Sequence, residues 1–289
     1  MSNIKPINNY RVRTATVKDV ELMIQLAKKE GWNPGLHDGK PFYAADPNGY
    51  FIGELETENG PEIISCVSGV KYENKFAFGG FYIVKEEYRK MDYGIKIYNH
   101  LIEYVGNLCL GIDGVVAQQE NYKKAGFVFA HNQMRYEGIN MKGKLQTECI
   151  PIKEIPLDDL IKYDSSVFMF NRKDFLKEWV VMPESYSLAI TDNSRLRGYG
   201  VIRKCYKGYK IGPIFAEINS IAEKLFLSLI EFSEGKEVYL DVPETNKDGM
   251  AMKEKYNMKY VFETARMYMN GNPNIPIDKV FGVTSFELG

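Results

Sequence analysis

The stretch at residues 81–94 constrains the fold of this chain more than any other. Its first four residues are apolar or aromatic and predict the end of a β-strand, a turn with Arg89 and Lys90 follows, and a helix is expected from near Gly94. The first N–H groups of a helix have no partner within it, and the helix dipole makes that end partially positive. A strand, a basic turn and a helix in this order therefore predict a site for an anion such as a diphosphate.

The rest of the first half alternates between strand and helix patterns. Strands are expected at residues 10–14, 50–55, 61–71, 75–84, 114–118 and 127–136. A first helix follows Thr16, an N-cap with Asp19 three residues later as in a capping box, and it ends at Gly31. Further helices are expected at residues 94–105 and 121–125. This order predicts a mixed α/β domain.

The second half repeats part of this pattern. The segment around Val261 and Phe262 echoes that around Val128 and Phe129, and each is followed at the same spacing by a glycine. Strands are also expected at residues 187–191, 198–205, 209–217 and 238–242, with one helix capped by Ser220 and another over residues 246–256. A repeat at this distance indicates a duplicated domain. We therefore expect residues 1–140 and 157–289 to form two domains, joined by a linker at residues 141–156.

Two stretches of the first half resemble motifs of the GNAT superfamily of N-acetyltransferases. Val84, Arg89 and Gly94 match the family's Val-x-x-x-x-Arg/Gln-x-x-Gly-x-Gly/Ala pattern, and Tyr122 opens a Tyr-x-x-x-Gly-Phe signature. The resemblance is specific over residues 81–127 and looser from about residue 153 onward, where the basic turn is missing. It implies an α/β fold of two GNAT-like mixed-sheet domains in tandem, with a degenerate second domain in a structural role.

The turn departs from the family pattern at Asp92, which stands where its first glycine is usual. Aspartate adopts a positive φ more readily than most residues, so the turn can keep its shape. Its carboxylate would repel a nearby diphosphate by about 1 kcal/mol in water and a few at an effective dielectric near 20. Arg89, Lys90 and Lys96 lie close enough in sequence to offset that repulsion. Total loss of coenzyme binding is therefore not implied.

The resemblance implies acetyl-CoA as co-substrate and direct attack of an amine on its thioester. Backbone groups of residues 82–84 would pair with the pantetheine arm, as an added strand does. Tyr122 is implied as the general acid that protonates the departing thiolate. The residues expected to bind the coenzyme belong mostly to the strand end and the turn: Tyr82, Ile83, Val84, Arg89, Lys90, Met91, Asp92, Tyr93, Gly94 and Asn121.

The general base stays open at this point, because several acidic or basic side chains could accept the proton of an alkylamine with a pKa near 10. Glu120 is the first candidate, and Asp113 also flanks the expected fifth strand. His37 and Asp38 lie in the segment expected to form the acceptor wall together with Trp32. An aromatic wall would suit an arylalkylamine or a similar small primary amine.

The composition and charge of the chain argue against several other functions. A formal net charge of -1 argues against a nucleic-acid partner, and no apolar stretch approaches the roughly 18 residues of a membrane helix. Residues 1–10 lack the pattern of a secretory signal, and the 4 Cys without CxxC spacing and 3 His predict no metal site. We therefore expect a cytoplasmic enzyme for a small amine, with its oligomeric state open. The alternatives are an inactive acyl-CoA-binding module and a protein N-acetyltransferase.

Overall fold

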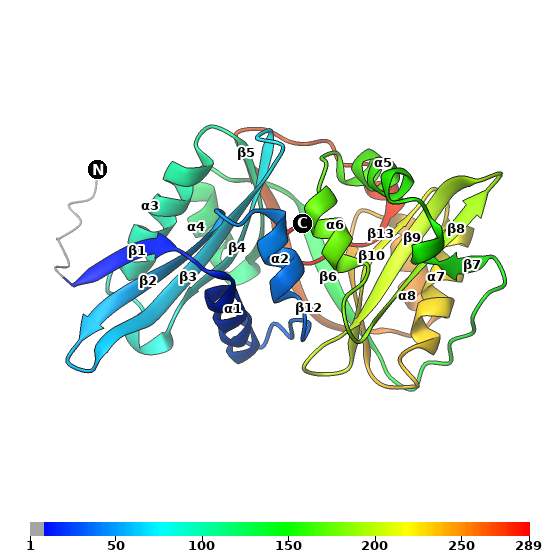
Figure 1. Cartoon of the computed structure of the whole chain (residues 1–289), viewed down its shortest axis with the longest axis horizontal. Coiled ribbons are helices and arrows are strands. Elements are labelled where there is room, and N and C mark those ends of the chain that lie inside the picture. The colour runs from blue at the N-terminus through cyan, green and yellow to red at the C-terminus, as the bar shows by residue number, and fades with distance from the viewer. Residues whose placement is uncertain (1–8) are drawn as a thin grey trace.

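The computed structural model describes residues 9–289, whose strands form one mixed β-sheet along the length of the molecule (Figure 1). Residues 1–8, which belong to the segment considered for a secretory signal, lie outside the described residues. The mixed α/β architecture expected from the sequence is confirmed.

The first half contains the elements β1 (Tyr10–Thr14), α1 (Val17–Lys29), α2 (Gly39–Ala45), β2 (Tyr50–Thr57), β3 (Gly60–Tyr72), β4 (Phe76–Val84), α3 (Tyr93–Val105), β5 (Cys109–Val115), α4 (Gln119–Lys124) and β6 (Val128–Gly138). The second half contains β7 (Cys149–Pro151), α5 (Leu157–Phe168), α6 (Lys173–Trp179), β8 (Ser185–Asp192), β9 (Arg195–Lys204), β10 (Tyr209–Ala216), α7 (Asn219–Glu231), β11 (Val238–Pro243), α8 (Lys247–Lys255), β12 (Lys259–Met269) and β13 (Val280–Gly282). Short 3-10 helices lie at Glu86–Tyr88, Val116–Gln118, Ile152–Glu154 and Ile277–Lys279. Helices α1, α2, α5 and α6 pack on one face of the sheet, and α3, α4, α7 and α8 pack on the other.

The two halves exchange their last long strands. In the sheet order, β12 lies between β5 and β6, while β6 lies between β12 and β11. The two exchanged strands are antiparallel, and Gln133 of β6 stands opposite Thr264 of β12. Because each half receives a strand from the other, the sheet of either half is incomplete without its neighbour.

Two buried ion pairs accompany this exchange. Arg135 on β6 donates to both carboxylate oxygens of Asp241 on β11, at 2.6 and 2.7 Å. Arg266 on β12 makes the same two-pronged contact with Asp113 on β5, at 2.7 Å for both bonds. A guanidinium and a carboxylate removed from water are stable only when each satisfies the other. These pairs therefore favour one register between β6 and β11 and one between β12 and β5.

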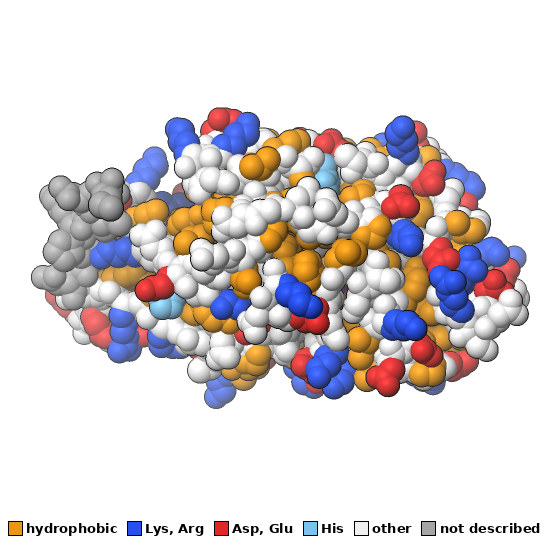
Figure 2. Space-filling view, turned by 90° about the horizontal axis from the view of Figure 1, so that it is seen from above, with side chains coloured by type: hydrophobic (Ala, Val, Ile, Leu, Met, Phe, Trp, Pro, Cys, Tyr) orange, Lys and Arg blue, Asp and Glu red, His pale blue; other side chains and the backbone are white. Residues whose placement is uncertain are grey.

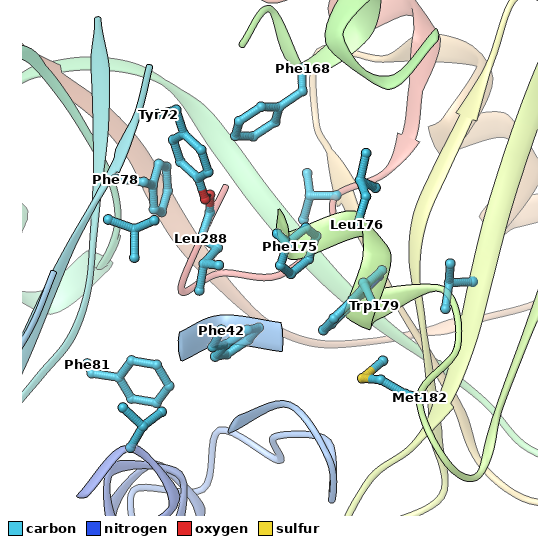
Figure 3. Packing of buried hydrophobic residues seen from close by; sticks show 14 of the residues in the cluster. Phe42, Tyr72, Phe78, Phe81, Phe168, Phe175, Leu176, Trp179, Met182 and Leu288 are labelled. Atoms are coloured by element: carbon cyan, nitrogen blue, oxygen red, sulfur yellow. The ribbon is translucent and has the colours of Figure 1, made fainter. Parts of the chain in front are cut away.

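The buried core between the halves is largely aromatic. Phe42 of α2 stacks on Trp179 of α6 with ring centroids 5.9 Å apart, and it contacts the edge of Phe81 on β4 at the same separation. Figure 3 shows these rings converging with Leu288 from the last segment of the chain. Buried aliphatic and aromatic side chains contribute roughly 1.5–3 kcal/mol each, so this layer stabilises the contact between the halves.

Local signals predicted some boundaries and missed others. The capping box is confirmed: the Thr16 amide donates to Asp19 at 2.7 Å, and the Asp19 amide donates back to the Thr16 hydroxyl. The strand expected at residues 114–118 was placed wrongly, because β5 begins at Cys109, where it pairs with β4. The cap expected at Ser220 was also wrong, since α7 begins one residue earlier without a side-chain cap.

The surface and side-chain clusters limit the kinds of site that are present. Seen from above, basic and acidic side chains are interspersed, and apolar side chains gather over the middle of the molecule (Figure 2). Within residues 9–289, no helix has the length and apolar character needed to cross a membrane. The same residues contain no group of three or more His, Cys, Asp or Glu side chains arranged to hold a metal ion.

The buried pair on β6 and β11 leads to a stability prediction. Asp241→Asn leaves the Arg135 guanidinium buried without a counter-charge, so the free energy of unfolding in urea should fall by about 3–5 kcal/mol. Asp174→Asn removes a carboxylate from an exposed pair with Lys177 and should cost at most about 1 kcal/mol. Equal losses in the two variants would contradict the role given to the buried pair.

Candidate active site

The two central strands of the first half separate at one end. β4 and β5 run parallel and pair over Phe76–Gly79 and Cys109–Ile112, after which no pairing joins them. Phe81 has a positive φ of 51°, and the register of β4 against β3 shifts beside it. A bulge of this kind bends a strand and redirects its backbone groups. The opening therefore leaves the β5-facing edge of residues 80–84 available to pair with an extended ligand.

The turn after β4 ends at an uncapped helix. Lys90 and Asp92 both adopt left-handed conformations, with φ of 64° and 62°, and α3 begins at Tyr93. No side chain caps α3, and no acidic residue lies in its first turn. Aspartate thus keeps the positive φ that glycine usually provides, while the free amides of the first turn remain able to bind an anion. This donor set fits the diphosphate of a coenzyme.

Arg89 is less free than the sequence suggests. Its Nε donates to the carbonyl of Val84 at 2.8 Å, and an Nη atom contacts the Glu30 carboxylate at the end of α1. The side chain therefore ties the end of β4 to α1 while it keeps its charge near the turn. Lys90 and Met91 are exposed beside it.

Two tyrosines lie at the opening. The hydroxyl of Tyr82 lies over Gly94. A Cβ added to Gly94 would come within 2.8 Å of this hydroxyl, so glycine is needed here to leave room for it. Burial raises the pKa of Tyr82 to about 12, and the neighbouring Tyr122 phenol adds to the effect. Tyr122 packs against Gly114 of β5, where an added Cβ would lie 2.3 Å from its ring. The Tyr122 ring thus lies beside the part of β5 that follows Ile112, its last residue paired with β4, and burial raises the pKa of the Tyr122 phenol.

Two of the candidate bases, both close to β5, already have partners. Glu120 is paired with Lys123 at 2.7 Å, and its side chain is 77% exposed. Asp113 is held by both arms of Arg266 in the buried pair at the strand exchange. Asn121, expected to bind the coenzyme, is exposed and donates to Gln118.

The segment expected to form the acceptor wall crosses to the second half. Asp38 is buried and accepts from Arg203 of β9 at 2.8 Å. His37 pairs with Glu184 at 3.1 Å and lines a groove of about 510 Å³ between α1, α2 and α6. The carbonyl of Trp32 accepts from Arg135, while its half-buried side chain packs against the central core. Asp38 thus has a structural partner, and His37 and Trp32 lie at the contact between the halves.

The matching opening in the second half is filled by the chain itself. β10 and β11 pair in parallel over only Tyr209–Ile211 and Val238–Leu240, and β13 then lies beside β10. The amide of Val283 donates to the carbonyl of Asp241 on β11, so the segment bridges both strands. Before α7, Glu217 pairs with Arg195 and Arg197, which places an acidic side chain where the first half has its basic turn.

The sequence patterns did not predict the bulge at Phe81, the packing of Tyr122 against Gly114, or the filling of the second half's opening by β13. The available signals were the Gly79-Gly80 pair just before Phe81 and the glycine that precedes the 3-10 turn. The basic turn and Tyr122, in contrast, were found from sequence because each belongs to a local motif.

Two family models match the chain, one on each half. The acetyltransferase (GNAT) family matches residues 18–127, which include β4, α3, β5 and α4, and the acetyltransferase (GNAT) domain matches residues 160–282. The chain belongs to the GNAT superfamily. It is a GNAT-type acyltransferase with two GNAT units in tandem, as the motif resemblance predicted.

Some relatives of this GNAT chain align with it over nearly its full length. Holothin acyltransferase from Pseudoalteromonas sp. (strain SANK 73390) is 28% identical and aligns over 96% of this chain and 94% of its own. A Pyrococcus horikoshii protein assigned as an acetyltransferase has a TM-score of 0.82 at 21% identity and aligns over 100% of this chain and 99% of its own. A tandem GNAT protein from the clavulanic acid biosynthesis pathway has a TM-score of 0.62 at 11% identity, covering 91% of this chain and 99% of its own. The tandem fold therefore recurs among distant members of the superfamily.

The difference between the two openings leads to a prediction about coenzyme stoichiometry. Calorimetric titration with acetyl-CoA should give one site per chain, because β13 fills the second opening. Gly94→Glu places a carboxylate at the second helical position of α3 and should abolish binding, because the charge repels the diphosphate and the added Cβ displaces the Tyr82 hydroxyl. Ser220→Glu makes the matched change in α7 and should leave the affinity unchanged. Two sites per chain, or loss in the Ser220 variant, would contradict this assignment.

Proposed function

We propose that this protein is an acetyl-CoA-dependent N-acetyltransferase for a small primary amine, with the chemistry in its first half. The observation that carries the proposal is the opening between β4 and β5, which combines a free strand edge with an uncapped helix N-terminus. The second half has neither an unfilled opening nor a basic turn. It serves, in this proposal, to complete the sheet and to cover the acceptor side.

The residues at the opening would hold acetyl-CoA, which supplies an acyl group activated as a thioester when bound. Backbone groups of residues 82–84 would pair with its pantetheine arm, because β4 has no other strand there. The amides from Asp92 to Gly94 would bind its diphosphate, with Lys90 adding a positive charge. Amides freed by the bulge at Phe81 would also stabilise negative charge on the acyl oxygen.

Tyr122 is the residue that we propose as the proton donor to the departing thiolate. Burial raises the pKa of its phenol above the ordinary value near 10, so the group is protonated at neutral pH, as a donor must be. Its contact with Gly114 fixes the ring at the side of the opening formed by β5.

A small acceptor is supported by a group of aromatic side chains around Arg135 at the contact between the halves. Phe262 of β12 and Phe286 of the last segment pack against each other, and the Arg135 guanidinium lies over both rings. Trp32 is linked to the same arginine through its carbonyl. Holothin acyltransferase, a relative over nearly the whole chain, is named for acyl transfer to holothin. An aromatic surrounding of this kind suits an arylalkylamine.

Thiol release with acetyl-CoA and a panel of amines tests the proposed function. We expect at least one small arylalkylamine or alkylamine to accelerate release, and a lysine-rich peptide to leave it at the background rate. Acceleration by the peptide alone would assign a protein N-acetyltransferase instead. Coenzyme binding without any accelerated release would favour an inactive binding module.

The role of Tyr122 is tested by Tyr122→Phe, which keeps the ring against Gly114 and removes the proton. Turnover of a responsive amine should fall by about 10²- to 10⁴-fold, the usual contribution of a general acid. Acetyl-CoA affinity, measured by calorimetry on the same variant, should change less than about twofold. Near-normal turnover would transfer the role to water, and a parallel loss of affinity would point to packing.

A further inference from the structure

The last segment of the chain, residues 283–289, connects the filled opening to the free one. It leaves β13 in the second half, and its buried end lies against β4 of the first half. The Tyr72 hydroxyl donates to the carbonyl of Leu288 at 3.0 Å, and Gly289 contacts the ring of Phe78. Figure 3 shows Leu288 within the aromatic core between the halves. The second half therefore delivers residues to the strand that borders the proposed acetyl-CoA site.

Glu287 lies in backbone contact with Gly80 of β4. A Cβ added to Gly80 would lie 2.5 Å from the carbonyl oxygen of Glu287 and 2.9 Å from its Cα. Gly80 is the residue after the last pair between β4 and β5 and directly precedes the bulge at Phe81. The backbone of Glu287 is thus located where the opening begins, and the next residue, Leu288, belongs to the core on the face of the sheet that carries α1 and α2.

The Glu287 carboxylate is buried without a close counter-charge. Within residues 9–289, no ion pair shorter than 4.0 Å and no hydrogen bond reaches it, and the residue is 5% exposed. Four charged side chains act on it from separate elements: Lys210 of β10, Asp38 before α2, Arg135 of β6 and Arg203 of β9. Asp38 and Arg203 pair with each other, and Arg135 pairs with a carboxylate on β11. Lys210 remains, and it too has no ion pair within 4.0 Å among these residues.

This setting suits a proton acceptor. Burial raises the pKa of Glu287 above its ordinary value, and Lys210 opposes that shift most strongly. A carboxylate with a raised pKa is a stronger base than an ordinary one. The carboxylates of Asp113, Asp38 and Glu120 are each paired with a cation, as described above. Perturbed groups without partners, close to a ligand opening, are typical of active sites.

We propose that Glu287, supplied by the second half, is the general base for the acceptor amine in the first half's site. This inference rests on the proposed function. The amine nitrogen forms a bond to the acyl carbon, the carbon–sulfur bond breaks, and its electron pair leaves on the CoA sulfur. The nitrogen's proton passes to the Glu287 carboxylate, directly or through one water, and the sulfur receives the Tyr122 proton. The products are the amide and free CoA thiol.

The experiment measures kcat/KM against pH for Glu287→Gln with an amine that the unaltered protein acetylates. Each value is divided by the fraction of the amine that is uncharged at that pH, so that protonation of the substrate does not contribute to the profile. For the unaltered protein we expect an acid limb as Glu287 gains a proton, since only its ionised form accepts one. In the variant, the rate should fall about 10²- to 10⁴-fold and that limb should disappear. Acetyl-CoA affinity, which tests the proposed function separately, should remain within about twofold.

Controls separate catalysis from folding. Glu137→Gln makes the same chemical change in a carboxylate that pairs with Lys207 and should leave the acid limb in place. Glu287→Asp keeps the carboxylate and its charge near Lys210, so it tests the proposal even if the glutamine variant is unstable, and it should shift the limb and lower the rate. An unchanged limb in both Glu287 variants would overturn the proposal. A joint loss of turnover and acetyl-CoA affinity would overturn it as well, because a structural role would then explain both.

Discussion

The exchange of β6 and β12 is the constraint on which the rest of the structure depends. Each strand completes the sheet of the other half, and each carries an arginine whose carboxylate partner lies on the neighbouring strand. Burying these charges is tolerable only when each arginine faces its carboxylate. A slip in strand register would leave a guanidinium buried without its partner. The exchange also sets the path of the chain, because β12 ends beside β5 and the following residues must return to the second half.

That return path explains how two similar units acquired different openings. A strand edge in the interior needs hydrogen-bond partners for its N–H and C=O groups. In the second half, β13 provides them beside β10, and Val283 continues the pairing to β11. In the first half, no strand of residues 9–289 lies beside the edge of β4 beyond Gly79 on the β5 side. The same architecture thus fills one opening with its own chain and leaves the other open.

Much of this could be predicted from local sequence. The capping box at Thr16 depends on two side chains three residues apart, and the basic turn and the helix at Tyr93 lie within a dozen neighbouring residues. The position of β5 could not be predicted in the same way, because its glycines weaken the strand pattern and pairing with β4 and β12 selects the segment. Helices α5 and α6 were missed, although their aromatic residues contribute much of the central core.

The sequence by itself determined the mixed α/β character, the duplicated pattern and the strand–turn–helix that predicts an anion site, because these depend on neighbouring residues. Only the tertiary structure decided which candidate side chains are available for chemistry. Asp113 and Asp38 are acidic in sequence, but arginines more than 150 residues away neutralise them. Glu287 lies some 200 residues from Gly80 in the chain and yet in contact with it. Such contacts follow from packing and strand pairing between the halves, which no local pattern encodes.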